Sequence, residues 1–121
     1  MAQHNNVGLK GEMAAIDFLR QNNYQILEHN WRFRRYEIDI IATDGISIIF
    51  VEVKTRSSDR WGNPEDAVSG IKIKRIVEAA DFYVKDNNID QPVRFDVISS
   101  IWNGRTFEIK HFDDAFLAPL D

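Results

Sequence analysis

The sequence predicts an α/β fold in which helices pack on a β-sheet, with the elements in the order α-β-β-β-α-β-β. Two segments carry apolar residues at helical spacing, and five others are rich in β-branched and aromatic residues. Turn signals such as Asp44-Gly45 and Asn103-Gly104 separate the extended segments. With 121 residues, 44% hydrophobic and 28% charged, the chain suffices for one globular domain, and we expect residues 1–121 to form it.

The first helix is expected over residues 7–22. Asn5 or Asn6 is suited to cap its start, and Asn22-Asn23 ends the apolar pattern. The stripe expected to face the core consists of Leu9, Met13, Ile16 and Leu19, with Ala15 beside them.

Three consecutive strands are expected over residues 24–34, 36–43 and 46–56. Because Asp-Gly between apolar runs is a strong hairpin signal, Asp44-Gly45 is expected to be a two-residue loop between the second and third strands. Both of these strands are apolar on two faces, as central strands are. One face of the second strand is expected to consist of Ile38, Ile40 and Ala42.

Beyond the third strand the sequence predicts a polar loop, a helix and two more strands. The helix should bury Ile73, Ile76, Val77, Ala80 and Val84. In order, the expected elements cover residues 57–64, residue 65 or 70 to 85, residues 92–101 and residues 105–111.

The composition excludes several classes of function. Without cysteine there is no disulfide, thiolate nucleophile or cysteine zinc site. No apolar run approaches the roughly 20 residues of a membrane span, and the polar first six residues lack the apolar core of a secretory signal. We therefore expect a cytoplasmic protein without a membrane partner.

Charge is distributed unevenly along the chain, whose net charge is −4. Residues 1–75 carry 11 Lys and Arg against 10 Asp and Glu, whereas residues 76–121 carry 4 against 9. If some acids of the first part face a metal ion, that part is effectively basic and suited to nucleic acid. A basic patch would then gather Arg32, Arg34, Arg35, Lys54, Arg56, Arg60, Lys72, Lys74 and Arg75.

Asp39 and the segment Glu52-Val53-Lys54 place two acids and a lysine where mostly apolar strands should pair. A two-residue loop would set Glu37 opposite Glu52 and make Asp39 its diagonal neighbour, roughly 7–8 Å away on the same face. A shift of one residue would separate them. Buried carboxylates that repel one another need a cation, and a shared divalent ion beside a lysine suggests phosphodiester cleavage. The alternative is a half-exposed strand with cross-strand ion pairs.

Several motifs in order resemble the PD-(D/E)xK nuclease superfamily and, over about residues 8–116, the uncharacterised bacterial YraN family, which is thought to be endonuclease-like. The spacing of the acids and lysine is also similar to that of archaeal Holliday-junction resolvases. Tyr36 departs from the family pattern, which usually has glycine there. The resemblance is carried by Gly8, Gly11-Glu12, Ala15, Asn30, Arg32, Glu37-Ile38-Asp39, the segment Phe50 to Arg56, Gly62, Lys72, Ala80, Arg94 to Val97 and Asp114-Ala115-Phe116.

This resemblance implies a restriction-endonuclease-like fold, with a mixed central sheet flanked by helices. It also implies that Asp39 and Glu52, helped by the main-chain carbonyl of Val53, bind Mg²⁺ or Mn²⁺. Lys54 would orient or deprotonate the attacking water, or hold the phosphate. The alternative for Lys54 is an ion pair with Glu52.

Two further acids have two interpretations each. Glu12 lies on the apolar stripe of the first helix, where it would reach the cleft as a further catalytic residue, or it is an acid in the first helical turn. Glu37 would join the metal site or pair with Arg35.

Basic and aromatic residues beyond the third strand are candidates for nucleic-acid binding. Trp61 would stack on an exposed base or close the edge of the core. Arg94 and Asp96 are expected to form a structural ion pair instead. Flanking phosphates would be held by Arg56, Arg60, Lys72 and Arg75. For Lys72 and Arg75, a solvated helix face is the alternative.

Three hypotheses for function follow. The first is a metal-dependent nuclease acting on DNA, including structured or branched DNA, with a homodimer where both strands are cut. The second is a non-catalytic module that binds nucleic acid or a partner and keeps the nuclease fold. The third is a structural interaction protein whose acids form surface ion pairs.

Overall fold

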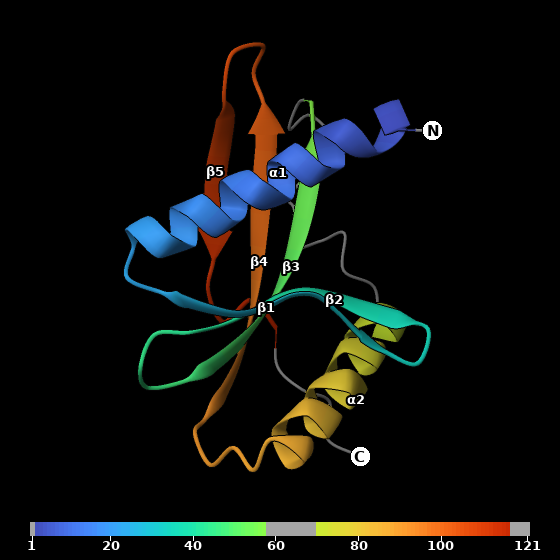
Figure 1. Ribbon diagram of the computed structural model, residues 1–121, viewed down its shortest axis with the longest axis vertical. Coiled ribbons are helices and arrows are strands. Elements are labelled where there is room, and N and C mark those ends of the chain that lie inside the picture. The colour runs from blue at the N-terminus through green and yellow to red at the C-terminus, as the bar shows by residue number, and fades with distance from the viewer. Residues whose placement is uncertain (1, 58–69, 117–121) are drawn as a thin grey trace.

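A computed structural model describes residues 2–57 and 70–116, with side chains from Val7 onward (Figure 1). This part of the chain contains a five-stranded sheet in the order β1-β2-β3-β4-β5. β3 and β4 are parallel, and the other neighbouring strands are antiparallel. The elements are α1 (Ala2–Gln21), β1 (Gln25–Phe33), β2 (Tyr36–Thr43), β3 (Ile48–Arg56), α2 (Gly70–Asp86), β4 (Val93–Trp102) and β5 (Phe107–Phe112).

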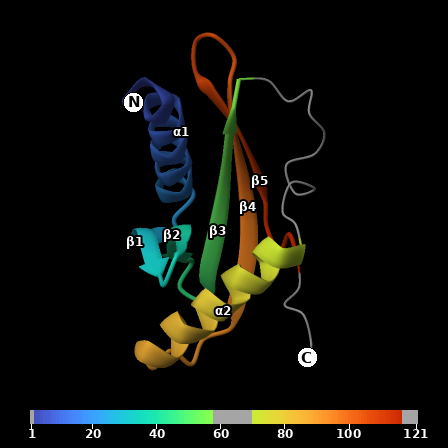
Figure 2. The same ribbon diagram turned by 90° about the vertical axis from the view of Figure 1, so that its right-hand side faces the viewer.

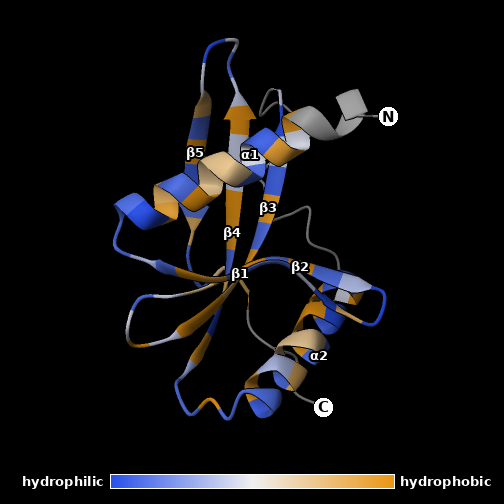
Figure 3. Cartoon of the chain, in the orientation of Figure 1, coloured by the Kyte–Doolittle hydropathy of each residue, from blue (hydrophilic) through white to orange (hydrophobic). Residues whose placement is uncertain are grey.

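The predicted fold class and element order are therefore confirmed, and the architecture is consistent with a restriction-endonuclease-like fold. α1 covers one face of the sheet and α2 the other, as Figure 2 shows. In Figure 3 both helices alternate between hydrophobic and hydrophilic positions, as helices with one buried face do. Neither described helix has the length and hydropathy that a membrane crossing requires.

β3 and β4 form the centre of the molecule because both of their faces are covered. Phe50 of β3 packs with Ile76 and Tyr83 in the cluster under α2. Its neighbours Ile49 and Val51 pack under α1 with Leu19. The predicted two-faced apolar pattern of β3 is thus confirmed, and the parallel β3–α2–β4 connection explains it, since such strands are covered on both sides.

The first helix begins earlier than predicted. α1 starts at Ala2, so Asn5 and Asn6 lie inside the helix and do not cap it. Leu9 and Met13 are 50% and 43% exposed, and their predicted place in the core is wrong. The reason is Gly11, where α1 crosses β3 so closely that a Cβ would lie within 3 Å of the Thr55 side chain, and the Ser100 hydroxyl donates to the Gly11 carbonyl.

The loop between β2 and β3 has four residues where two were predicted. Thr43 pairs with Ile48, and Ile40 pairs with Val51, so the predicted register is wrong by two residues. The Asp44 carboxylate accepts hydrogen bonds from the backbone amides of Ile46 and Ser47, which closes the longer loop. A shift of two residues preserves the face on which each side chain lies.

β2 rotates about its own axis near Asp39. Ile40 and Ala42 pack in the cluster under α1, whereas Ile38 packs in the cluster under α2. The prediction that these three side chains share a face is therefore wrong. In Figure 1 the β1–β2 hairpin curls away from the plane of β3 and β4, as a strongly twisted two-stranded ribbon does.

Candidate functional site

The candidate site lies where β2 and β3 separate. Their backbone ladder runs from Thr43 and Ile48 to Ile40 and Val51, although both strands continue beyond it. Beyond this ladder a side chain replaces the backbone as acceptor, because Asp39 Oδ2 accepts a hydrogen bond from the Val53 amide at 2.8 Å. Asp39 therefore closes the end of the ladder and holds its side chain beside the Glu52-Val53-Lys54 segment.

Glu52 is a buried acid with two partners. Its side chain is on the face of β3 that carries Phe50, and the residue is only 7% exposed. The Tyr36 hydroxyl donates to its Oε1 at 3.2 Å, and the Lys72 ammonium lies 2.5 Å from its Oε2. Burial and the negative charges of Glu52 and Asp39 raise the pKa of Tyr36, so its phenol stays protonated and can donate.

Asp39 is the less well compensated of the two acids. The pKa of Asp39 is raised to about 7, first by burial and then by repulsion from Glu52, while the hydrogen bond from the Val53 amide acts in the opposite direction. The two carboxylates are thus close enough for the charge of one to act on the other. The register from which a diagonal arrangement was predicted is wrong, because Ile40 pairs with Val51, a shift of two residues.

Lys54 and Lys72 lie together beside the acids. Burial lowers the pKa of Lys54, and the neighbouring amine of Lys72 lowers it further. For Lys72, burial disfavours the charged form, but the hydrogen bond and attraction of Glu52 outweigh it and raise the pKa. The recorded ion-pair partner of Glu52 is therefore Lys72, and the predicted alternative of a Lys54–Glu52 pair is replaced by this one.

The main-chain carbonyl of Val53 points to the same side of β3 as its amide. In an extended strand the N–H and C=O of one residue point toward the same neighbour. Since the Val53 amide points to Asp39, its carbonyl is also directed away from β4. Two carboxylates and one carbonyl are hard oxygen donors of the kind that Mg²⁺ and Mn²⁺ prefer.

This donor set fits such an ion in kind but supplies few protein ligands. Within residues 2–57 and 70–116, no three acidic or histidine side chains are grouped so as to hold a metal ion. A divalent ion bound here would complete its shell with water or substrate oxygens, which Mg²⁺ commonly does. It would also meet the Lys72 ammonium, which already neutralises Glu52.

A family profile described as "Uncharacterised protein family UPF0102" matches residues 11–99, which include all of these groups. The chain belongs to the UPF0102 family. It is 50% identical to a UPF0102 protein of Parabacteroides distasonis, covering 98% of each chain. It is 48% identical to one of Bacteroides fragilis, covering 99% of each, and 46% identical to one of Christiangramia forsetii, covering 96% of this chain and 98% of the relative. The predicted YraN resemblance is confirmed.

Two acids singled out in this UPF0102 sequence make other contacts. Glu12 Oε1 lies 3.1 Å from His29 Nε2 on β1, and its charge is also felt at Asp39. It is in the middle of α1, so the first-turn interpretation is wrong. Glu37 approaches Arg32 at 3.8 Å across the β1–β2 ladder and not the predicted Arg35, and the observed β2–β3 register does not set it opposite Glu52.

The predicted phosphate-binding residues of the UPF0102 chain lie in different places. Arg56 ends β3, with one buried guanidinium nitrogen that has no hydrogen-bond partner. Arg75 lies on α2 and lines a pocket beside the site. Arg60 and Trp61 are outside the described residues. Lys72 pairs with the acid Glu52, and it lies four residues before the buried Ile76, on the same face of α2.

The predicted structural ion pair between Arg94 and Asp96 is confirmed. Asp96 is fully buried, and both of its oxygens accept hydrogen bonds from the Arg94 guanidinium at 2.8–2.9 Å. His111 and the Asp114 amide complete the network. Every oxygen of Asp96 is thus satisfied by protein groups, which distinguishes it from Asp39 and marks it as structural.

Proposed function

We propose that this protein is a metal-dependent nuclease that hydrolyses phosphodiester bonds of DNA at the Asp39–Glu52–Lys54 site. One observation carries the proposal. Where the β2–β3 ladder ends, the Val53 amide holds the Asp39 carboxylate beside β3, and burial together with the charge of Glu52 raises the pKa of Asp39 to about 7. A carboxyl group whose pKa is raised by burial and by a second negative charge is stabilised in its ionised form when a cation binds beside it. Membership of UPF0102 is compatible with the proposal but names no activity.

The residues would divide the work as follows. Asp39, Glu52 and the Val53 carbonyl would hold Mg²⁺ or Mn²⁺. When bound, such an ion supplies positive charge that stabilises the charge gathering on the phosphoryl oxygens. Lys54, whose pKa is lowered by burial and by Lys72, is more readily neutral than an exposed lysine. In its neutral form it would accept a proton from the attacking water, and in its charged form it would hold the phosphate.

A second candidate function is favoured by Lys72. Its ammonium sits on Glu52 as an internal counter-ion, which is an arrangement that needs no metal. On this reading the protein binds nucleic acid without cleaving it and keeps the nuclease fold. Salt-dependent binding that ignores divalent ions would then be expected.

DNA with a branch or a flap is the substrate we propose first. The groups are supplied by one chain and form one site, so a cut in both strands of a duplex or junction requires two copies. A homodimer is therefore part of the proposal for such substrates, whereas cleavage of a flap or a single strand needs only one copy.

Cleavage of labelled flap, junction, single-strand and duplex DNA in Mn²⁺, Mg²⁺ and EDTA tests the proposal. Asp39→Asn and Lys54→Ala should each lower the rate about a hundredfold or more, the usual effect of losing such a group. The matched controls are Asp81→Asn and Lys85→Ala, an exposed ion pair on α2. Both should cleave like the wild type.

Two results separate the candidates. DNA binding that is the same in EDTA and Mn²⁺, with no cleavage of any substrate, would reject the nuclease and support the binding module. Cleavage that survives in both Asp39→Asn and Lys54→Ala would show that the reaction, if any, belongs to another site.

A further inference from the structure

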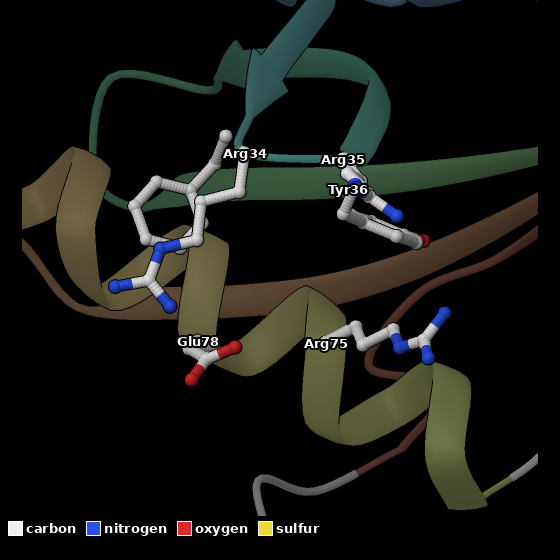
Figure 4. Close-up of a pocket in the computed structure, with 6 residues that line it drawn as sticks. Arg34, Arg35, Tyr36, Arg75 and Glu78 are labelled. Carbon is white, nitrogen blue, oxygen red and sulfur yellow. The ribbon is translucent and has the colours of Figure 1, made fainter.

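A pocket with basic side chains lies between the β1–β2 turn and α2, beside the acid site. A pocket of about 490 Å³ is lined there by three arginines, two aromatic residues and one acid. Figure 4 shows their side chains around the opening. The lining consists of Phe33, Arg34, Arg35, Tyr36, Arg75 and Glu78.

The turn presents its arginines at some cost in conformation. Arg34 has a φ of 58°, in the left-handed region that side chains other than glycine, asparagine and aspartate seldom adopt. Its guanidinium lies over the Phe33 ring, 5.0 Å from the ring centroid. A strained position occupied by a residue poorly suited to it points to a use for that side chain.

The charge of the pocket is positive. Arg34, Arg35 and Arg75 carry three positive charges against the one negative charge of Glu78. The ion pairs found within the described residues include none of these three arginines. Their donors are therefore available to an anion, and guanidinium groups match phosphate oxygens well.

The cations are spread along the pocket. In Figure 4, Arg34 and Glu78 lie toward one end, while Arg35, Tyr36 and Arg75 lie toward the other. A single free phosphate would favour donors that converge on one point. Donors spread along a groove suit a strand that carries successive phosphates.

Tyr36 connects this pocket to the acid site. It lines the pocket, and its hydroxyl donates to Glu52. A strand lying in the pocket would therefore pass next to the Asp39–Glu52 pair.

We propose that this arginine pocket binds successive backbone phosphates of the DNA strand whose neighbouring phosphodiester lies at the Asp39–Glu52 site. The inference rests on the proposed function for the choice of DNA. It assigns Arg34 and Arg35, which no comparison marks, to substrate binding, and it gives Arg75 a defined place.

Binding of fluorescent single-stranded and flap DNA in EDTA tests the pocket without cleavage. Arg35→Gln and Arg75→Gln should each weaken binding about tenfold, the value of one charge-assisted contact. Each should also lower the slope of log K against log salt by about 0.7 to 0.9. Glu78→Gln should tighten binding. The control is Arg105→Gln, an exposed arginine of the β4–β5 turn, which should change neither quantity.

The outcomes are separable from those of the nuclease assay. If no DNA is cleaved but Arg35→Gln and Arg75→Gln still weaken binding, the pocket stands and the nuclease does not. If DNA is cleaved while both variants behave like Arg105→Gln, the pocket proposal falls alone. Wild type that binds no DNA also overturns it. So does displacement of DNA by equimolar thymidine monophosphate, because the pocket would then take free nucleotides. Melting curves confirm that each variant is folded.

Discussion

Replacing Lys72 by methionine should have opposite effects on folding and on metal binding. The Lys72 ammonium lies 2.5 Å from Glu52 Oε2, on a carboxylate side chain that is only 8% exposed. Removing one member of a buried ion pair costs about 3–5 kcal/mol. Because the Lys72 side chain is 30% exposed and Tyr36 still donates to Glu52, we expect the lower end, about 3 kcal/mol without metal.

The same change should strengthen metal binding. A divalent ion that uses Glu52 must displace or share it with Lys72, so the wild-type affinity includes the cost of disturbing that pair. Lys72→Met removes this cost. If Mn²⁺ binding to Lys72→Met restores most of the 3 kcal/mol of stability that the substitution removes, the affinity of this variant for Mn²⁺ is about a hundredfold higher than that of the wild type, because 1.4 kcal/mol corresponds to tenfold.

Urea unfolding in EDTA and in Mn²⁺ measures both effects, with Lys85→Met as the control from the exposed pair with Asp81. Lys72→Met should be much less stable than wild type in EDTA and nearly equal to it in saturating Mn²⁺. A loss of stability that is the same with and without Mn²⁺ would refute the reasoning, since Glu52 would then not take part in metal binding.

Three other predictions concern single residues. The folded-state pKa of Asp39 is about 7 against an ordinary 3.8, so its ionisation opposes folding. In urea unfolding in EDTA, the free energy of unfolding of the wild type should fall as the pH rises from 3.8 to 7, relative to that of Asp39→Asn. Asp39→Asn should lack this fall because residue 39 then has no carboxylate to ionise. Asp96 is fully buried, with its pKa held below the ordinary 3.8 by His111 and a guanidinium that outweigh burial, so its stabilisation is present above pH 3.8 and is lost only below it. Asp96→Asn should cost about 3–5 kcal/mol at pH 7 by urea unfolding. Gly11→Ala would bring a Cβ into contact with the Thr55 side chain and should cost about 1–3 kcal/mol. Gly8→Ala meets nothing within 4 Å and should not destabilise α1 in thermal melts.

The sequence predicts that Asp39 and Glu52 lie close together, although the register that it predicts for β2 and β3 is wrong by two residues. The Asp-Gly signal predicts a two-residue loop, but the Asp44 carboxylate accepts hydrogen bonds from the amides of Ile46 and Ser47, and the loop has four residues. The resulting shift is two residues, which is the period of a strand, so the shift itself does not move Asp39 and Glu52 to opposite faces, and the charge of Glu52 still acts on Asp39. Alternation along a strand is thus a safer guide to a site than the exact pairing.

Features that depend on how elements cross were not predictable in this way. The pairing of Lys72 with Glu52 requires the first turn of α2 to lie over β3, and no pattern within α2 specifies that crossing. The rotation of β2, which sends Ile38 and Ile40 to different clusters, arises from twist that accumulates beyond the end of the ladder. The arginine pocket likewise joins a turn and a helix that are far apart in the sequence.

The unequal state of the two carboxylates follows from these crossings. Glu52 lies on a central strand, where α2 supplies a cation and β2 supplies the Tyr36 hydroxyl. Asp39 lies on a strand that is turning away, and its recorded hydrogen bond is to the Val53 amide. The fold therefore presents one neutralised acid and one poorly compensated acid side by side. Two equally exposed acids on a surface strand would show neither the raised pKa of Asp39 nor the buried Lys72–Glu52 contact, so the surface ion-pair interpretation does not account for this site.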